Sequence, residues 1–114
     1  MTKEIKIPNG IELNNGEYAI KLGFANLFHR PGIADGGQLL LTNERLIFLA
    51  HAVNINSNLL LSIDLKDIID LRIATNLLIN QIIAVKDNLQ KETKFVVYKG
   101  KNWIKLINEE IEKY

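Results

Sequence analysis

Apolar and polar residues alternate along most of this chain with the period of two that is typical of β-strands. The clearest case spans residues 36–48, where two apolar runs flank a polar break at Asn43-Glu44. Because asparagine tolerates the left-handed backbone of a tight turn, this stretch predicts a β-hairpin. One face of the hairpin is expected to point into the core: Leu39, Leu41, Leu46, Phe48 and Ala50.

Five further stretches alternate in the same way and predict five more strands. They begin at Tyr18 and cover residues 18–24, 59–63, 69–73, 78–86 and 93–98. Turn signals separate them, and Phe28 to Gly32 marks a turn followed by a loop that runs to Gly37. One helical turn or corner is expected at Asp64 to Asp67.

The alternation also predicts which side chains of these strands face the core. In the first strand Tyr18, Ile20, Leu22 and Phe24 share a face, and Gly23 suggests a bend or bulge. In the strand at residues 69–73 the inward residues are Ile69, Leu71 and Ile73. In the last strand they are Phe95 and Val97.

The period changes after Gly100, where apolar residues recur every three or four positions, as on one face of a helix. We expect an amphipathic helix with Asn102 as its N-cap. A helix this short needs a docking surface to persist, and Trp103 and Ile107 are the expected contacts.

Seven short strands followed by one helix predict a mainly β protein, either a small antiparallel barrel or an orthogonal sandwich, with the helix over one open end. Residues 1–16 do not follow the pattern, because Pro8 and two Asn-Gly pairs interrupt it. We expect them to form an N-terminal arm or edge strand. The domain proper then covers residues 17–114.

Composition narrows the function classes. The chain has 114 residues, enough for one domain with its own core. It has no cysteine, so disulfides and thiolate metal sites are excluded. A net charge of +1 gives no strong field toward nucleic acid. The N-terminus has no apolar signal-peptide core and no apolar run is long enough to span a bilayer, which leads us to expect a cytoplasmic protein, with a peripheral membrane location left open.

Four segments resemble a known family: Gly37-Gln38-Leu39-Leu40-Leu41-Thr42-Asn43-Glu44-Arg45-Leu46-Ile47-Phe48, then Ser62-Ile63-Asp64-Leu65-Lys66-Asp67-Ile68, then Lys94-Phe95-Val96-Val97, and Trp103 in the helix. Together they look like a GRAM domain of the pleckstrin-homology-like superfold, over most of residues 17–114. The resemblance implies a seven-stranded antiparallel barrel capped by a C-terminal helix, without catalysis or cofactor. It also implies binding of phosphoinositides, other lipids or proteins. The residues that carry the fold signature are Thr42, Asn43, Arg45, Phe48 and Trp103.

The candidate lipid-binding residues are Lys21, His29 and Arg30, which match the region where pleckstrin-homology relatives place basic residues around their first loop. Lysine and arginine would neutralise phosphate charge there. The expected second strand, residues 38–42, adds no Lys or Arg. We therefore favour solvated surface residues over an inositol-phosphate pocket.

Arg45, beside the hairpin turn, is interpreted as a structural residue that pairs with Asp64, Asp67 or Glu44. No metal site is expected, because the two histidines have no carboxylate or cysteine near them in sequence. Catalytic motifs such as a nucleophile elbow or a phosphate loop are also missing, so the chain is not expected to be an enzyme. Basic residues do not interleave with aromatics, so nucleic acid is not an expected partner.

The remaining signal is apolar: several strands carry apolar residues on the face opposite the expected core. These are Leu40, Ile47, Leu49, Ile68 and Ile82. They predict either a protein interface, with a two-fold homodimer as the simplest case, or a surface covered by the arm. The sequence therefore favours a non-catalytic module for protein interaction or self-association, and the alternative is membrane targeting through anionic lipid head groups.

Overall fold

The computed structural model describes residues 5–30, 33–51, 60–77 and 80–114; at positions 29, 30, 33, 76 and 77 it describes the backbone alone. The elements are β1 (Ala19–Arg30), β2 (Ile33–Thr42), β3 (Arg45–Ala50), β4 (Leu60–Asp64), the 3₁₀ turn η1 (Leu65–Asp67), β5 (Ile68–Leu77), β6 (Asn80–Asp87), β7 (Glu92–Tyr98) and α1 (Gly100–Ile111). The predicted mainly β fold with one C-terminal helix is confirmed.

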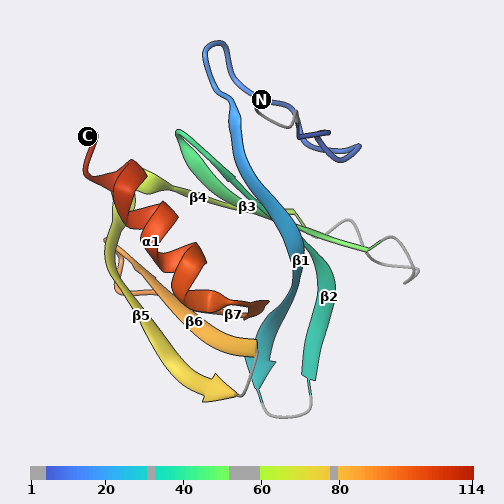
Figure 1. Ribbon diagram of the computed structural model, residues 1–114, viewed down its shortest axis with the longest axis vertical. Helices are drawn as coiled ribbons and strands as arrows, with labels where there is room; N and C mark the ends of the chain where they lie inside the picture. The colour runs from blue at the N-terminus through green and yellow to red at the C-terminus, as the bar shows by residue number, and fades with distance from the viewer. Residues whose placement is uncertain (1–4, 31–32, 52–59, 78–79) are drawn as a thin grey trace.

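All seven strands are antiparallel and form one sheet in the order β4-β3-β2-β1-β7-β6-β5. The sheet curls around its own inner face, and α1 lies over β5 and β6 at one side (Figure 1). Trp103 and Ile107 of α1 are fully buried, as the helical period predicted. In the part of the chain that the structure describes, no helix is long and apolar enough to cross a membrane.

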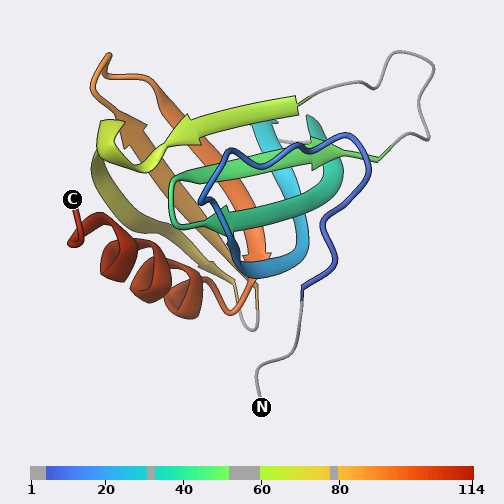
Figure 2. The same cartoon turned by 90° about the horizontal axis from the view of Figure 1, so that it is seen from above.

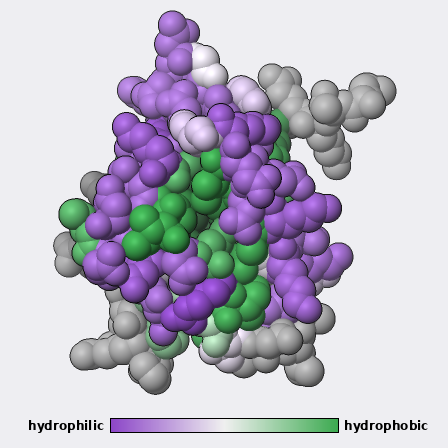
Figure 3. All heavy atoms as spheres, turned by 90° about the vertical axis from the view of Figure 1, so that its left-hand side faces the viewer, coloured by the Kyte–Doolittle hydropathy of each residue, from purple (hydrophilic) through white to green (hydrophobic). Residues whose placement is uncertain are grey.

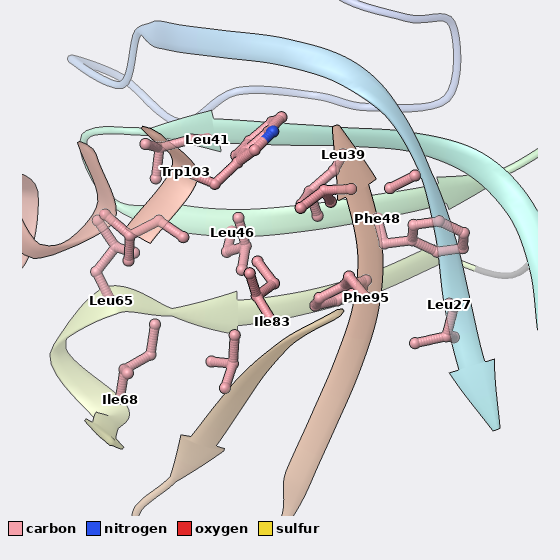
Figure 4. Close-up of a cluster of buried hydrophobic side chains, with 14 of the residues drawn as sticks. Leu27, Leu39, Leu41, Leu46, Phe48, Leu65, Ile68, Ile83, Phe95 and Trp103 are labelled. Carbon is pink, nitrogen blue, oxygen red and sulfur yellow. The ribbon is translucent and has the colours of Figure 1, made fainter. Parts of the chain in front are cut away.

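The hairpin predicted at residues 36–48 is confirmed, although its first strand and the strand before it are longer than expected. β1 runs to Arg30 and β2 starts at Ile33, so the expected loop up to Gly37 is instead paired strand. The inner face of the sheet carries the core (Figure 4), whose largest buried side chains include Phe48, Phe95, Leu39 and Leu41. The helical turn expected at Asp64 to Asp67 is η1.

A bulge in β1 makes one face prediction wrong. The register with β2 shifts between Ala19 and Lys21, so residues after the shift point to the opposite face. Ile20 packs against the core, whereas Leu22 packs on the outer side. Gly23 faces inward, where a Cβ atom would lie 3.1 Å from Cζ2 of Trp103. Phe24 points outward.

A second bulge, between Ile68 and Asp70 in β5, overturns two more predictions. Ile68, expected outside, is buried in the core, and Ile69, expected inside, is 54% exposed. Beyond the bulge the alternation holds, because Leu71 and Ile73 pack against the core as predicted.

The helix begins earlier than predicted, and Asn102 is not its cap. Lys99 precedes the helix in a left-handed conformation (φ 54°), and the N–H of Gly100 donates to the side-chain oxygen of Gln81. A Cβ atom at Gly100 would lie 2.9 Å from both Gln81 and Ile83, so this residue lets the helix start directly against β6. The N–H of Asn102 donates to the carbonyl of Lys99 within the first turn.

Candidate functional site

The outer face of the sheet has two parts, and the N-terminal arm covers the first. The arm, residues 5–17, crosses β2 and β3 (Figure 2). Ile11 packs against Leu40 and Ile47, and these three form a buried apolar cluster on the outer face. Around this cluster lie partly buried apolar residues from the arm and the strands: Ile5, Ile7, Leu13, Ala19, Leu22 and Leu49.

This packing decides between the two interpretations of the predicted interface. Leu40 and Ile47 are fully buried, and Leu49 is partly buried beside the arm, with its methyl groups 3.7 and 3.8 Å from the position of a Cβ on Gly10. The arm therefore occupies the surface where a partner would otherwise bind. Of the four predicted interface residues, Ile82 alone lies away from the arm cluster.

Glu17 anchors the arm to the β2–β3 turn. Arg45 donates to both of its carboxylate oxygens, at 2.7 and 2.9 Å, and the Thr42 hydroxyl donates to Oε2 at 2.6 Å. The backbone N–H of Asn14 adds a bond of 2.8 Å. Arg45 thus pairs with Glu17, which was not among the expected partners Asp64, Asp67 and Glu44.

The Glu17 carboxylate has a strongly lowered pKa. Burial acts in the opposite direction, but hydrogen bonds from Arg45, Thr42 and the Asn14 backbone, with the charge of Arg45, outweigh it. Together they lower the pKa from 4.5 to about 2. The carboxylate is therefore charged at neutral pH, and the turn residues Thr42 and Arg45 fasten the arm with a buried ion pair.

Asn43, at the tip of the same turn, fastens the backbone of the arm. Its side-chain oxygen accepts from the N–H of Tyr18 at 2.8 Å, and its amide donates to the carbonyl of Gly16 at 3.3 Å. Phe48 and Trp103 lie in the core instead. The five residues of the family motif thus divide into three that hold the arm and two that fill the barrel.

The second part of the outer face lies on β1, β7 and β6. We call it the open face and define it by Phe24, Ile82, Val96 and Tyr98. The register places Val96 beside Ile82 on β6, while Tyr98 pairs with Asn80. Phe24 is 75% exposed and Tyr98 is 55% exposed, whereas the other two are partly buried.

A shallow hollow of about 280 Å³ lies within the open face. Phe24 and Tyr98 border it, together with three polar side chains: Asn26, His51 and Asn80. The ring of His51 lies 6.1 Å from that of Phe24, and the Lys99 ammonium lies 5.3 Å from the Tyr98 ring. Aromatic rings bordered by amides suit contact with another protein surface, because the rings contribute apolar area and the amides contribute hydrogen bonds.

The predicted lipid-binding residues are not brought together on β1. Lys21 lies near the start of the strand, with its ammonium 5.1 Å from the Trp103 ring. His29 and Arg30 end the strand, about 25–30 Å further along at the usual rise per residue, and their side chains are outside the description. The three residues remain a prediction.

Reactive groups do not gather on the described residues. Over residues 5–30, 33–51, 60–77 and 80–114, no three His, Cys, Asp or Glu side chains are placed to hold a metal ion. The described ion pairs, such as Arg45–Glu17 and Arg72–Glu92, join residues from separate segments of the chain.

Sequence reasoning missed Phe24, Val96 and Tyr98 as surface residues, as well as the partner of Arg45. Phe24 was assigned to the core because a bulge five residues earlier cannot be seen in an alternating pattern. Tyr98, by contrast, has a visible signal: Phe95 and Val97 were correctly placed inside, so parity puts Val96 and Tyr98 outside.

No protein-family model matches the chain, and no curated protein matches it. Solved structures do. The Vps36 N-terminal PH domain superposes with a TM-score of 0.70 at 17% identity, over 90% of this chain and 84% of that one. The C-terminal domain of an unknown protein from Leishmania infantum gives a TM-score of 0.64 at 17% identity, covering 85% and 87%.

A third match is to the complex of PDZ-RhoGEF DH/PH domains with GTP-γ-S activated RhoA, with a TM-score of 0.66 at 14% identity over 87% of this chain and 30% of that one. These likenesses establish a pleckstrin-homology-like fold. At such identities they establish the fold alone, because one fold hosts many functions.

Proposed function

We propose that this chain is a non-catalytic, protein-binding module of GRAM type that self-associates through its open face. The observation that carries the proposal is the exposure of Phe24 (75%) and Tyr98 (55%) on one sheet face, while the arm covers the apolar residues of the neighbouring face. A chain that covers one apolar surface with its own segment and leaves another bare has a surface available for a partner.

Several features support a protein partner at this face. Aromatic side chains contribute much of the energy of protein interfaces, and two of them border the same hollow. Asn26, Asn80 and His51 form a polar rim around it. A net charge of +1 creates little repulsion between two copies, which makes a two-fold homodimer the simplest assembly.

The GRAM assignment rests on the turn motif. Thr42, Asn43 and Arg45 each make a hydrogen bond that holds the arm or the turn, which supports a structural role for the motif in this chain. The alternative function, membrane targeting, depends on Lys21, His29 and Arg30. Lys21 contacts the Trp103 ring, so its charge is directed toward α1.

Sedimentation velocity over a range of micromolar concentrations tests the proposal. The wild-type chain is expected to form a dimer as concentration rises, and Phe24→Ser is expected to shift this transition to higher concentration. Leu89→Ser is the matched control, because Leu89 is an 83% exposed apolar residue on the β6–β7 turn, away from the open face. A wild-type chain that stays monomeric throughout would refute self-association.

Co-sedimentation with vesicles separates the alternative function. Neutral, phosphatidylserine and phosphoinositide vesicles are compared at low and high salt. Binding to the anionic vesicles that weakens with salt and with Arg30→Ala would favour lipid targeting. No pelleting with any vesicle, together with a dimer sensitive to Phe24→Ser, is the result the proposal predicts.

A further inference from the structure

A second apolar hollow lies between β5 and α1, on the other side of the molecule from the arm. It has a volume of about 240 Å³ and is lined by Ile68, Ile69, Asp70, Leu71, Asn108 and Ile111. Figure 3 shows this side of the molecule, where a hydrophobic strip runs between two hydrophilic borders. We call this hollow and the adjoining edge of β5 the β5 groove.

The β5 strand is an edge of the sheet. Within the described residues it pairs with β6 alone, so every second backbone N–H and C=O along it points away from the sheet. Bulges between Ile68 and Asp70, and between Ile73 and Thr75, interrupt its register. They leave one regular stretch, Asp70–Ile73, directly beside the hollow.

The two sheet edges differ in what they offer a partner. β4, the other edge, has five residues, and short edges are a common protection against unwanted pairing. β5 has ten residues, and its hollow places apolar side chains from strand and helix beside the free backbone groups. An incoming strand would thus gain hydrogen bonds and apolar contact at the same place.

We propose that the β5 groove binds a short extended segment of a partner protein, which adds as a strand along Asp70–Ile73 and inserts one apolar side chain between Leu71 and Ile111. A strand is the occupant that supplies both donors and acceptors at the spacing of a sheet edge. The regular stretch sets the paired length at about four residues, with further residues free to extend beyond it.

Charge at the groove adds a requirement on the segment. The Asp70 carboxylate borders the hollow, and its nearest cation, Arg72, is 4.0 Å away and already bonded to Glu92 at 2.9 and 3.0 Å. A lysine or arginine next to the inserted apolar residue would therefore meet uncompensated negative charge. The expected segment alternates apolar and polar residues and carries a basic residue beside the apolar one.

This inference is independent of the proposed function, because the β5 groove and the open face share no residue. Its test is selection from a displayed library of short random peptides against the wild-type chain. The same library is selected against Ile69→Glu, which places a charge in the groove at a 54% exposed position. Leu89→Glu is the matched control, with the same change at an exposed position outside the groove.

Peptides enriched on the wild-type chain and on Leu89→Glu, but not on Ile69→Glu, are the expected result. The most enriched peptide is then synthesised, together with a copy N-methylated at every second amide. Removing these donors is expected to weaken binding at least about tenfold, since even one or two lost hydrogen bonds have that effect. Amide hydrogen exchange should slow at Asp70–Ile73 on binding.

Three results would each overturn the proposal. One is the absence of any peptide enriched over the Ile69→Glu selection. Another is equal affinity of both N-methylated copies, methylated on alternate sets of amides. The third is protection of amides elsewhere than β5. None of these outcomes would alter the dimer transition, and the Phe24→Ser substitution would not alter peptide binding, so failure of either proposal leaves the other distinguishable.

Discussion

The ion pair that anchors the arm makes a quantitative prediction for Glu17→Gln. Glutamine preserves the shape of the side chain and can still accept hydrogen bonds, but it removes the charge facing Arg45. The Glu17 side chain is fully buried, and its pKa is lowered from 4.5 to about 2. A shift of that size corresponds to about 3 kcal/mol of stability at neutral pH.

The sign follows from the direction of the shift. Because the folded-state pKa is below the unfolded one, the contribution is fully present above pH 4.5 and is lost as pH falls toward 2. Linkage gives about 3 kcal/mol at pH 7, roughly 1.4 kcal/mol at pH 3 and about 0.4 kcal/mol at pH 2. The difference between wild type and Glu17→Gln should therefore shrink as the solution is acidified.

Urea unfolding at pH 7 and pH 3 measures this difference. With an m-value of about 1.5 kcal/mol/M, the expected shift in midpoint at pH 7 is about 2 M, and about half of that at pH 3. Glu92→Gln is the matched control, because Arg72 also donates twice to Glu92, at 2.9 and 3.0 Å, but its side chain is 47% exposed. That pair should contribute less than about 1 kcal/mol.

Two outcomes would refute this reasoning about Glu17. In the first, Glu17→Gln and Glu92→Gln shift the midpoint equally at pH 7, which would mean that burial does not strengthen the pair. In the second, the effect of Glu17→Gln is the same at both pH values, which would mean that the charge of Glu17 is not its source.

Two further stability predictions follow from packing and are measured by urea unfolding. Gly37→Ala should destabilise the chain by more than about 3 kcal/mol, because the added Cβ would lie 2.2 Å from the Leu49 carbonyl oxygen; Gly36→Ala should cost far less, since its nearest atom is a side-chain oxygen at 3.2 Å, and equal costs would contradict the contact geometry. Ile11→Ala should cost about 2–4 kcal/mol and increase binding of a hydrophobic dye, because it removes the arm residue that buries Leu40 and Ile47; an effect below about 0.5 kcal/mol would mean that the arm is not packed there.

Several of these stability effects depend on contacts that local pattern could not reveal, although the pattern did determine much of the fold. The alternation in residues 36–48 correctly separated Leu39, Leu41, Leu46 and Phe48, which face the core, from Leu40 and Ile47 on the other face. The change of period after Gly100 correctly predicted a helix that docks through Trp103 and Ile107. Such features depend on the spacing of neighbouring residues, which is fully written in the sequence.

Face assignments failed where a single extra residue entered a strand. The bulges near Ala19 and Ile69 shift the pairing by one position, and a shift of one exchanges the two faces of a strand. Phe24 and Ile69 were assigned to the core for this reason, yet both are exposed. A bulge is set by pairing with the neighbouring strand, so alternation within one strand does not reveal it.

The candidate sites depended most on the tertiary structure. Glu17 and Arg45 are separated by 28 positions, and among several acidic residues near the turn in sequence only the folded arm selects one partner. Likewise, the arm had two alternatives in the sequence, and its packing over Leu40 and Ile47 moved the free apolar surface to β1, β6 and β7. Exposure is a property of what the rest of the chain leaves uncovered, and the local pattern of a strand carries no information about distant segments.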